Sequence, residues 1–235
     1  MNGKIKIFSI GILLLIFILP SVTYAQIGIK GGIVLSGYQP WQDLTPFEGN
    51  DYQPFLGYEV DWIQDDASFP DLGLQIGIFY TIELSKYFSL QPELYYSQRG
   101  LNFYQTELYN TTYSLNVSYL ELPMLLQYNL PLDWKIKPSL FLGPYVAFKL
   151  SASRTLNIEG EKNTKDIPGV SNLDYGLVFA INTEFIAWSQ NLMFELRFNW
   201  GLANAMKQPD DYTALYEDAG RATVLAFTFM TGIRF

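Results

Sequence analysis

Twelve charged side chains recur in the stretches of the sequence that alternate between apolar and polar residues, and they are the first candidates for chemistry. Six are cations and six are carboxylates: Lys30, Glu83, Glu93, Arg99, Glu121, Lys137, Lys149, Asp174, Glu184, Glu195, Arg197 and Arg234. Glu93 and Glu121 could act as a general acid and base if they faced a substrate. We favour ion pairing, because a charge buried in a protein needs a partner of opposite sign. The twelve residues therefore predict an internal network of ion pairs.

The sequence contains no His and no Cys, and this removes whole classes of chemistry. Imidazole-based catalysis, zinc sites with Cys or His ligands and disulfide bonds are excluded. The sequence also lacks a Gly-x-Ser-x-Gly nucleophile motif, a Walker-type phosphate loop and a dinucleotide fingerprint. We therefore predict a protein that is not an enzyme and carries no cofactor.

Composition narrows the class of protein further. The 235 residues are 49% hydrophobic and 17% aromatic but only 16% charged, which excludes a disordered chain. The 23 Asp and Glu residues outnumber the 15 Lys and Arg residues, and the formal net charge is −8. A nucleic-acid partner is not expected, because binding a phosphate backbone requires a basic surface.

The first 25 residues have the features of a secretory signal peptide. Lys4 and Lys6 precede an apolar run over residues 7–19, and small residues at Thr23 and Ala25 fit the usual cleavage positions. The run is short for a transmembrane helix, so an uncleaved anchor helix is the less favoured alternative. We predict a cleaved signal peptide over residues 1–25 and one exported domain over residues 26–235.

Eight segments of the remaining chain alternate between apolar and polar residues with a period of two, as a β-strand with two unlike faces does. They span residues 27–39, 72–84, 87–101, 117–130, 135–151, 173–186, 192–202 and 225–235. Connections after the second, fourth and sixth segments are short, whereas those over residues 40–71, 102–116, 152–172 and 203–221 are long. Short turns at one end and long loops at the other predict an all-β fold, an up-and-down antiparallel transmembrane β-barrel of eight strands.

Alternation alone does not decide which face of the barrel points inward. A soluble, lipocalin-like periplasmic barrel would enclose the apolar side chains and bind an apolar ligand, whereas a membrane barrel turns them outward. An eight-stranded interior has too little room for so many bulky groups, and the polar set is rich in glycine and balanced in charge. Aromatic residues also gather near the segment ends, as at a membrane interface. We therefore predict a membrane barrel with a plugged polar lumen; a narrow solute channel is a further alternative.

Four prolines fall inside the expected strands: Pro92, Pro123, Pro138 and Pro144. Proline has no backbone N–H to donate to a neighbouring strand and is normally found at sheet edges or bulges. A closed barrel has no free edge, so we expect local bulges or missing strand pairs at these positions.

The first long connection differs from the others in its charge. Between residues 40 and 71 the sequence holds eight Asp and Glu residues and no Lys or Arg, interleaved with aromatic residues. Because loops on a rigid scaffold commonly carry binding groups, we predict a recognition loop for a protein or glycan partner, with these candidate residues: Trp41, Asp61, Trp62, Asp65 and Asp66. A solvated acidic loop and a divalent-cation site are the alternatives.

Short motifs along the chain carry a resemblance to a known family. They are GIKGG at residues 28–32, LQPELYYSQRG at 90–100, YLELP at 119–123, GPY at 143–145, DYG at 174–176, RFNWGL at 197–202 and GIRF at 232–235. In the order and spacing of these motifs the sequence resembles the small outer-membrane β-barrels of the PorT type.

The resemblance implies an eight-stranded barrel in the outer membrane of a Gram-negative bacterium, in contact with its lipids. It also implies insertion by the barrel-assembly machinery, with Phe235 as the aromatic signal that this machinery reads. It implies no reaction, since the family is broad. We therefore expect a non-enzymatic, porin-like integral barrel that is structural or serves as a partner-binding accessory in envelope transport or secretion, through its extracellular loops.

Overall fold

The computed structural model describes residues 25–40, 68–105, 111–132, 136–158, 161–166, 170–187, 189–205 and 222–235. They form these strands: β1 (Ala25–Pro40), β2 (Ser68–Glu83), β3 (Phe88–Gln105), β4 (Thr111–Asn129), β5 (Lys137–Ile158), β6 (Glu161–Asp166), β7 (Leu173–Ala187), β8 (Gln190–Gly201) and β9 (Ala222–Arg234). In this part of the chain, no helix has the length and apolar character needed to cross a membrane. Of the expected signal peptide, only Ala25 lies within the described residues.

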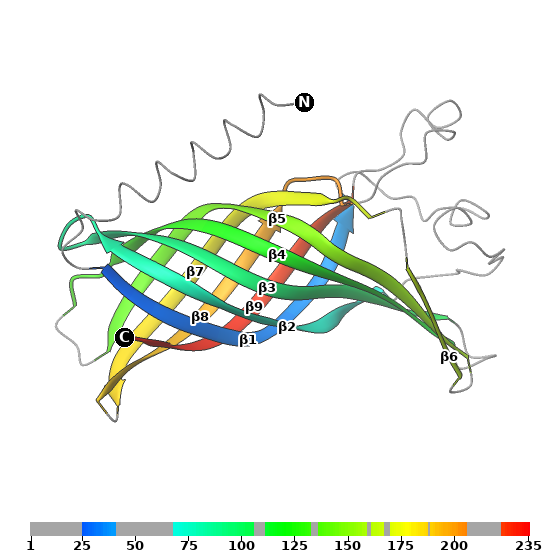
Figure 1. The fold of residues 1–235 in the computed structure, drawn as a ribbon, viewed down its shortest axis with the longest axis horizontal. Helices are drawn as coiled ribbons and strands as arrows, with labels where there is room; N and C mark the ends of the chain where they lie inside the picture. Colours follow the sequence, from blue (N-terminus) through cyan, green and yellow to red (C-terminus); the bar gives the residue numbers. More distant parts are fainter. Residues whose placement is uncertain are drawn as a thin grey trace, which may run out of the picture.

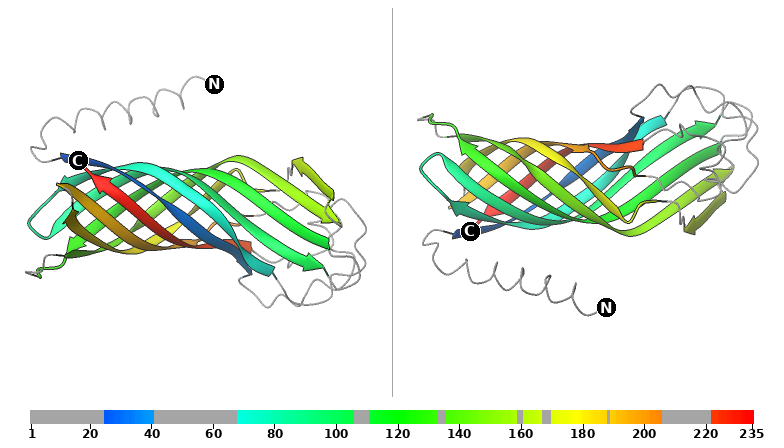
Figure 2. Two further views of the ribbon diagram at one scale, coloured as in Figure 1. Left: turned by 90° about the horizontal axis from the view of Figure 1, so that it is seen from below. Right: turned by 90° about the horizontal axis from the view of Figure 1, so that it is seen from above.

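Eight of the strands close into a barrel (Figure 1). The ring consists of β1, β2, β3, β4, β5, β7, β8 and β9, each paired antiparallel with the strand on either side. The β1–β9 ladder, from Gly28↔Arg234 to Pro40↔Ala222, completes it. Figure 2 shows the strands inclined to the long axis of the barrel. The predicted antiparallel barrel of eight strands is therefore confirmed.

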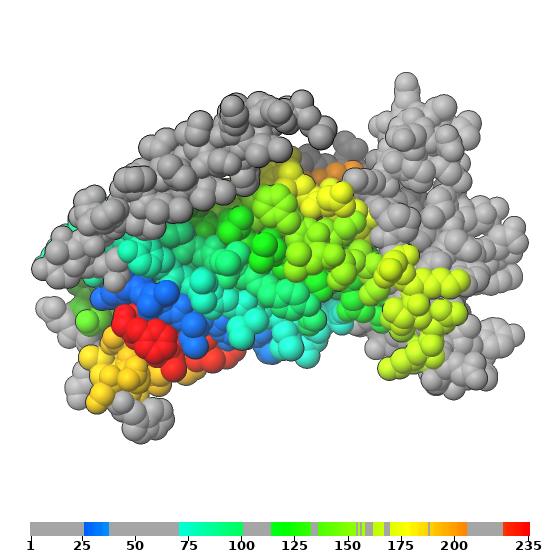
Figure 3. Space-filling model, viewed as in Figure 1, coloured from blue at the N-terminus to red at the C-terminus, as the bar shows by residue number. Residues whose placement is uncertain are grey.

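Side chains along the strands alternate between the interior and the outer wall, as a pleated backbone requires. In β8, Glu195 and Arg197 are buried, whereas Leu196 between them is 61% exposed. Large exposed side chains of the wall include Ile29, Ile76, Leu126, Leu142, Ile181, Leu196 and Phe229. Figure 3 shows such side chains of β1, β2, β3 and β9 packed next to one another on one face of the wall. The apolar set therefore faces outward and the polar set inward, which is the arrangement of a membrane barrel.

Strands β3, β4 and β5 continue beyond the expected segments. Residues 152–172 are expected to form a loop, but β5 runs on to Ile158 and pairs with β6, from Ser153↔Asp166 to Ile158↔Glu161. β6 takes no part in the ring and projects beyond it, at the end away from the C terminus (Figure 1). The loop prediction is wrong here because these residues are rich in Ser, Thr and Asn. They show little alternation in hydropathy, yet the backbone pairs regularly.

Three of the four prolines interrupt a ladder on one side. Two pairs are missing between Phe79↔Glu93 and Ile82↔Leu90 beside Pro92, two between Pro92↔Met124 and Tyr95↔Glu121 beside Pro123, and two between Pro123↔Tyr145 and Leu126↔Leu142 beside Pro144. Each ladder resumes in the same register, so the irregularity is a gap and not a bulge. Pro138 keeps its pair with Thr183, at the start of β5. Register shifts occur elsewhere, between Ser118 and Tyr119 and between Pro70 and Gln75.

Candidate functional site: the charged lumen

Four buried side chains form a closed set of ion pairs in the lumen, which we call the central cluster: Lys30, Glu93, Glu195 and Arg197. Lys30 Nζ lies 3.0 Å from Glu93 Oε1 and 2.5 Å from Glu195 Oε2. Arg197 Nη2 lies 2.6 Å from Glu93 Oε2 and 2.6 Å from Glu195 Oε1. Both carboxylates are thus shared by both cations, and the charges of the cluster sum to zero.

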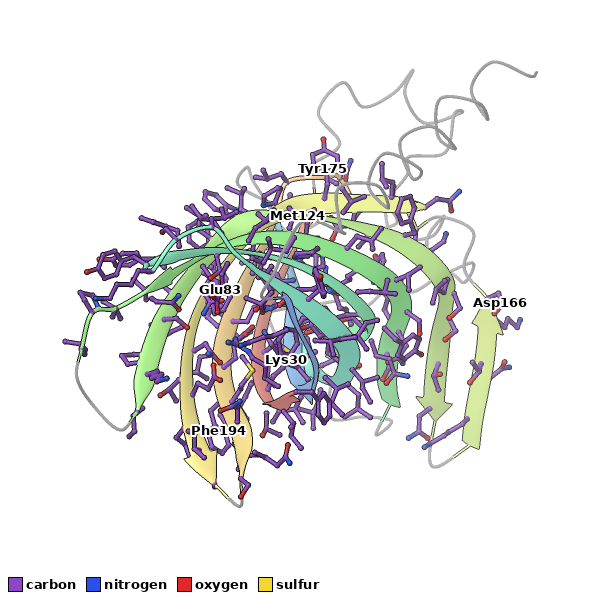
Figure 4. The ribbon with its side chains drawn as sticks, turned by 60° about the vertical axis from the view of Figure 1, so that its left-hand side comes forward. Lys30, Glu83, Met124, Asp166, Tyr175 and Phe194 are labelled. Carbon is purple, nitrogen blue, oxygen red and sulfur yellow. The ribbon has the colours of Figure 1, made fainter. Side chains whose placement is uncertain are left out.

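The central cluster spans the lumen. Glu93 comes from β3 and Arg197 from β8, and three strands separate β3 from β8 in either direction around the ring. The ion pair between them therefore joins opposite walls. Lys30 from β1 lies inside the ring (Figure 4) and meets both carboxylates. Side chains from opposite walls of the barrel are therefore paired at this level of the lumen.

Aromatic rings and amides surround the central cluster. Lys30 Nζ lies 4.7 Å from the ring centroid of Phe79 and 5.2 Å from that of Phe141, and Arg197 Cζ lies 5.1 Å from that of Tyr95. The negative faces of these rings attract the cations. Gln91 Nε2 donates to Glu93 Oε1 over 2.7 Å. These neighbours replace the water that the charges lose on burial.

A second set of buried charges, the Arg99 cluster, consists of Arg99 from β3, Glu121 from β4 and Asp174 from β7. Arg99 Nη2 lies 2.7 Å from Glu121 Oε1, and Arg99 Nη1 lies 2.9 Å from Asp174 Oδ2. The Tyr145 hydroxyl also donates to Asp174 Oδ2, over 2.9 Å. The guanidinium carbon lies 5.4 Å and 5.3 Å from the ring centroids of Tyr119 and Tyr145. Arg99 therefore pairs with both carboxylates, and its guanidinium group lies beside two tyrosine rings.

A third ion pair lies where the strands meet the short turns. Arg234 Nη1 lies 3.1 Å from Glu184 Oε2 and donates to Gln26 Oε1 over 3.2 Å. Both charged side chains are partly exposed, unlike those of the two clusters. This pair joins β7 and β9 at the rim.

Nine of the twelve charged residues selected from the sequence lie in these three sets. The other three are placed differently. Glu83 and Lys137 are exposed at the ends of β2 and β5. Lys149 is half-buried beside a register shift, and its Nζ donates to Val170 O over 2.6 Å. The candidate loop residues Trp41, Asp61, Trp62, Asp65 and Asp66 lie outside the described residues.

Sequence reasoning missed the uncharged partners of the clusters, because it treated aromatic residues as belonging to the outer wall. Phe79, Tyr95, Tyr119, Phe141 and Tyr145 all point inward. Glycines make room for two of them. A Cβ at Gly28 would overlap the ring of Phe79, and one at Gly176 would lie 2.8 Å from Tyr145 Cε1. The missed signal is the strand parity, since each ring lies an even number of residues from a charged residue on its own strand.

Two observations bear on other kinds of site. Among the described residues, no three His, Cys, Asp or Glu side chains are grouped in a way that could hold a metal ion. An apolar hollow of about 800 Å³ is lined largely by outward-facing residues of the wall, such as Ile33, Leu196 and Phe229. It therefore lies on the lipid-facing side of the wall.

A closed eight-stranded ring with an apolar outer wall and an ion-paired interior defines a transmembrane β-barrel. The sequence matches the family described as outer membrane protein beta-barrel domain over residues 20–207. The chain belongs to this family and is an integral outer-membrane barrel. A search of curated proteins gave no match.

Solved structures give similar architectures at low identity. OprG from Pseudomonas aeruginosa is 12% identical, with a TM-score of 0.43 and coverage of 90% of this chain and 96% of that one. Ail, the attachment invasion locus protein of Yersinia pestis, solved with the heparin analogue sucrose octasulfate, is 10% identical, with a TM-score of 0.40 and coverage of 91% and 100%. Neisserial surface protein A is 10% identical, with a TM-score of 0.39 and coverage of 90% and 97%.

Proposed function

We propose that this outer-membrane barrel has no enzymatic activity, that its lumen is plugged, and that it works as a structural or partner-binding accessory in envelope transport or secretion. The observation that carries the proposal is the Glu93–Arg197 ion pair, which joins opposite walls inside the central cluster. A barrel whose interior is filled in this way offers its extracellular loops, and not its lumen, to other molecules.

The plugged lumen makes solute passage unfavourable. Opening the lumen at the central cluster requires separating Lys30 and Arg197 from the two carboxylates that both of them contact. An unpaired buried charge has a high free-energy cost. We therefore expect the purified protein to give no stable, stepwise ion conductance in planar lipid bilayers. A narrow solute channel is the competing function, and stepwise conductance by the folded wild-type barrel would establish it in place of the plug.

The acidic first loop is the proposed partner-binding element. We expect crosslinking in intact envelopes to join it to a defined protein or glycan partner through Trp41 and Trp62, with Asp61, Asp65 and Asp66 setting the charge. Replacing both tryptophans by Ala should remove the crosslinked product and leave the barrel folded. The matched control replaces Lys162 and Lys165 on the separate β5–β6 hairpin. Equal crosslinking by the tryptophan variant and the wild type would rule out this loop as the recognition element.

The route to the membrane is part of the same proposal. We infer that residues 1–25 are removed as a signal peptide and that the barrel-assembly machinery inserts the chain among outer-membrane lipids. Phe235 is exposed and donates its backbone N–H to Ile27 O over 2.9 Å, and we propose it as the aromatic residue that is read during insertion. The PorT-type motifs support membership of that narrower group within the family. Recovery of the protein in the soluble periplasmic fraction without detergent would favour the lipocalin-like alternative.

A further inference from the structure

We propose that the open edge of β6 pairs with β6 of a second copy of this chain, by antiparallel strand addition centred on Thr164. Two barrels joined in this way point in opposite directions, so the contact links barrels in two apposed membranes. This self-association uses the β5–β6 hairpin and not the first loop, and it goes beyond the proposed function.

Strand β6 lies at the margin of the sheet, at the end of the barrel away from the C terminus. Among the described residues it pairs with β5 alone, from Ser153↔Asp166 to Ile158↔Glu161. Figure 4 shows β6, with Asp166 labelled, as the outermost strand on its side of the sheet. The side chains of residues 162–166 are all exposed. A strand with one unpaired edge is a template to which another strand can add.

The geometry of the hairpin determines which backbone groups face this open edge. Only residues 159–160 separate the two strands, and so short a turn closes on a hydrogen-bonded pair. The two kinds of pair then alternate, which makes Thr155↔Thr164 a non-hydrogen-bonded pair, the kind in which side chains lie closer. The 3.0 Å distance between the two threonine Oγ1 atoms agrees with this. Lys162, Thr164 and Asp166 therefore direct their N–H and C=O groups toward the open edge.

The charges along β6 are complementary to themselves. When two copies pair antiparallel about Thr164, each Lys162 lies opposite Asp166 of the second copy, and the two threonines face each other. All residues with edge-facing backbone groups then form hydrogen-bonded pairs. Moving the centre by one residue in either direction loses one of these pairs and both Lys–Asp contacts. Edge lysines normally oppose strand addition, but here opposite charges on facing strands favour this register.

Symmetry fixes the relative orientation of the two barrels. Two identical strands that pair antiparallel are related by a two-fold axis perpendicular to the sheet. That axis reverses the direction of every strand, and therefore the direction of the barrel. Copies inserted into one membrane share one orientation, so the pairing joins a barrel in one membrane to a barrel in an apposed membrane. A single contact of this size is weak, but many copies on facing surfaces act together.

The absence of cysteine from the sequence makes a crosslinking test specific. Thr164→Cys places one residue on the two-fold axis, with its Cα about 5.5 Å from that of its copy. Barrels in phosphatidylcholine vesicles, with the hairpin outside, should give a covalent dimer with a bis-methanethiosulfonate reagent of similar span.

The matched control for the crosslink is Thr155→Cys. It removes the same contact between threonine hydroxyls but lies on β5, so that the two copies of this residue are about 14 Å apart. This variant should give no dimer. Equal dimer yields from both variants, or no dimer from either, would overturn the proposal.

Exchange of charge tests the register. Lys162→Asp and Asp166→Lys each place like charges opposite one another, twice in the two-fold pair. Each variant alone should reduce vesicle aggregation, measured by light scattering, about tenfold. Heat-modifiable gel mobility should show both barrels folded. A mixture of vesicles that carry one variant with vesicles that carry the other restores the Lys–Asp contacts and should aggregate like the wild type. A mixture that stays dispersed would contradict the pairing.

Removal of the hairpin tip gives a check that does not depend on charge. Vesicles that carry the barrel with residues 155–164 replaced by Asn-Gly should stay dispersed. Aggregation equal to that of the wild type would place the contact elsewhere on the protein and contradict the proposal. Wild-type vesicles that remain dispersed would contradict it as well.

Discussion

At the scale of single residues, Glu93 is central to the ion-pair network of the lumen, because its carboxylate accepts hydrogen bonds from Lys30, Arg197 and Gln91. Replacing Glu93 by Gln leaves two buried cations with one carboxylate. We expect the free energy of unfolding to fall by about 3–5 kcal/mol, the usual cost of breaking a buried ion pair by removing one partner. Urea unfolding of the refolded barrel in lipid vesicles would measure the change.

The matched control for this prediction is Glu83→Gln at the exposed end of β2. Its effect should stay within about 0.5 kcal/mol, as for most surface substitutions. Equal stability of the Glu93→Gln variant and the wild type would show that the central cluster is hydrated and does not act as a closed plug.

At the scale of secondary structure, β6 lies outside the ring, and residues 155–158 of β5 pair only with β6 and with residues 111–114 of β4. Removing the tip of this hairpin should therefore leave the other ladders of the barrel intact. Replacing residues 155–164 by Asn-Gly leaves Arg154 opposite Lys165, in the pairing parity that a two-residue turn requires. We expect the heat-modifiable folded form to persist with an unchanged unfolding midpoint. By contrast, Tyr145→Ala within the ring portion of β5 should destabilise by about 3 kcal/mol, since it removes a buried ring and the hydrogen bond to Asp174. A hairpin deletion that unfolds the barrel would contradict the separation of β6 from the ring.

The strands show what could be predicted from sequence and what could not. The period-two alternation predicted the strands of the ring, because lipid and lumen impose opposite requirements on neighbouring residues. Over residues 152–166 polar and charged residues occur on both faces of the strands, so that contrast is weak and the hairpin was not predicted. The charged residues of the lumen could be identified individually from the sequence, but the sequence could not show which of them pair with one another. The Glu93–Arg197 contact joins residues 104 positions apart, and it depends on the stagger of strands around the ring.

At the scale of the whole molecule, the orientation of the apolar set distinguishes a membrane barrel from a soluble one. Leu196 lies on the outer wall of β8, and Arg at this position should cost about 2–4 kcal/mol in a lipid bilayer, most at the midplane. Guanidinium unfolding in phospholipid vesicles would measure the loss. Asn163→Arg on the exposed β6 is the matched control and should have almost no effect. If Leu196→Arg were neutral or stabilising, the outer wall would be facing water.

The positions of the central cluster along the chain have a consequence for the time course of assembly. Its members come from the first, third and penultimate strands of the ring, β1, β3 and β8. If the sheet were still open at the β1–β9 ladder, β3 and β8 would lie far apart, and Glu93 and Arg197 would keep their hydration shells. Loss of that water and closure of the β1–β9 seam must then occur together. We expect water to remain in the lumen until the β1–β9 seam closes. We also expect this closing step to be the slowest step of assembly and the most sensitive to salt concentration.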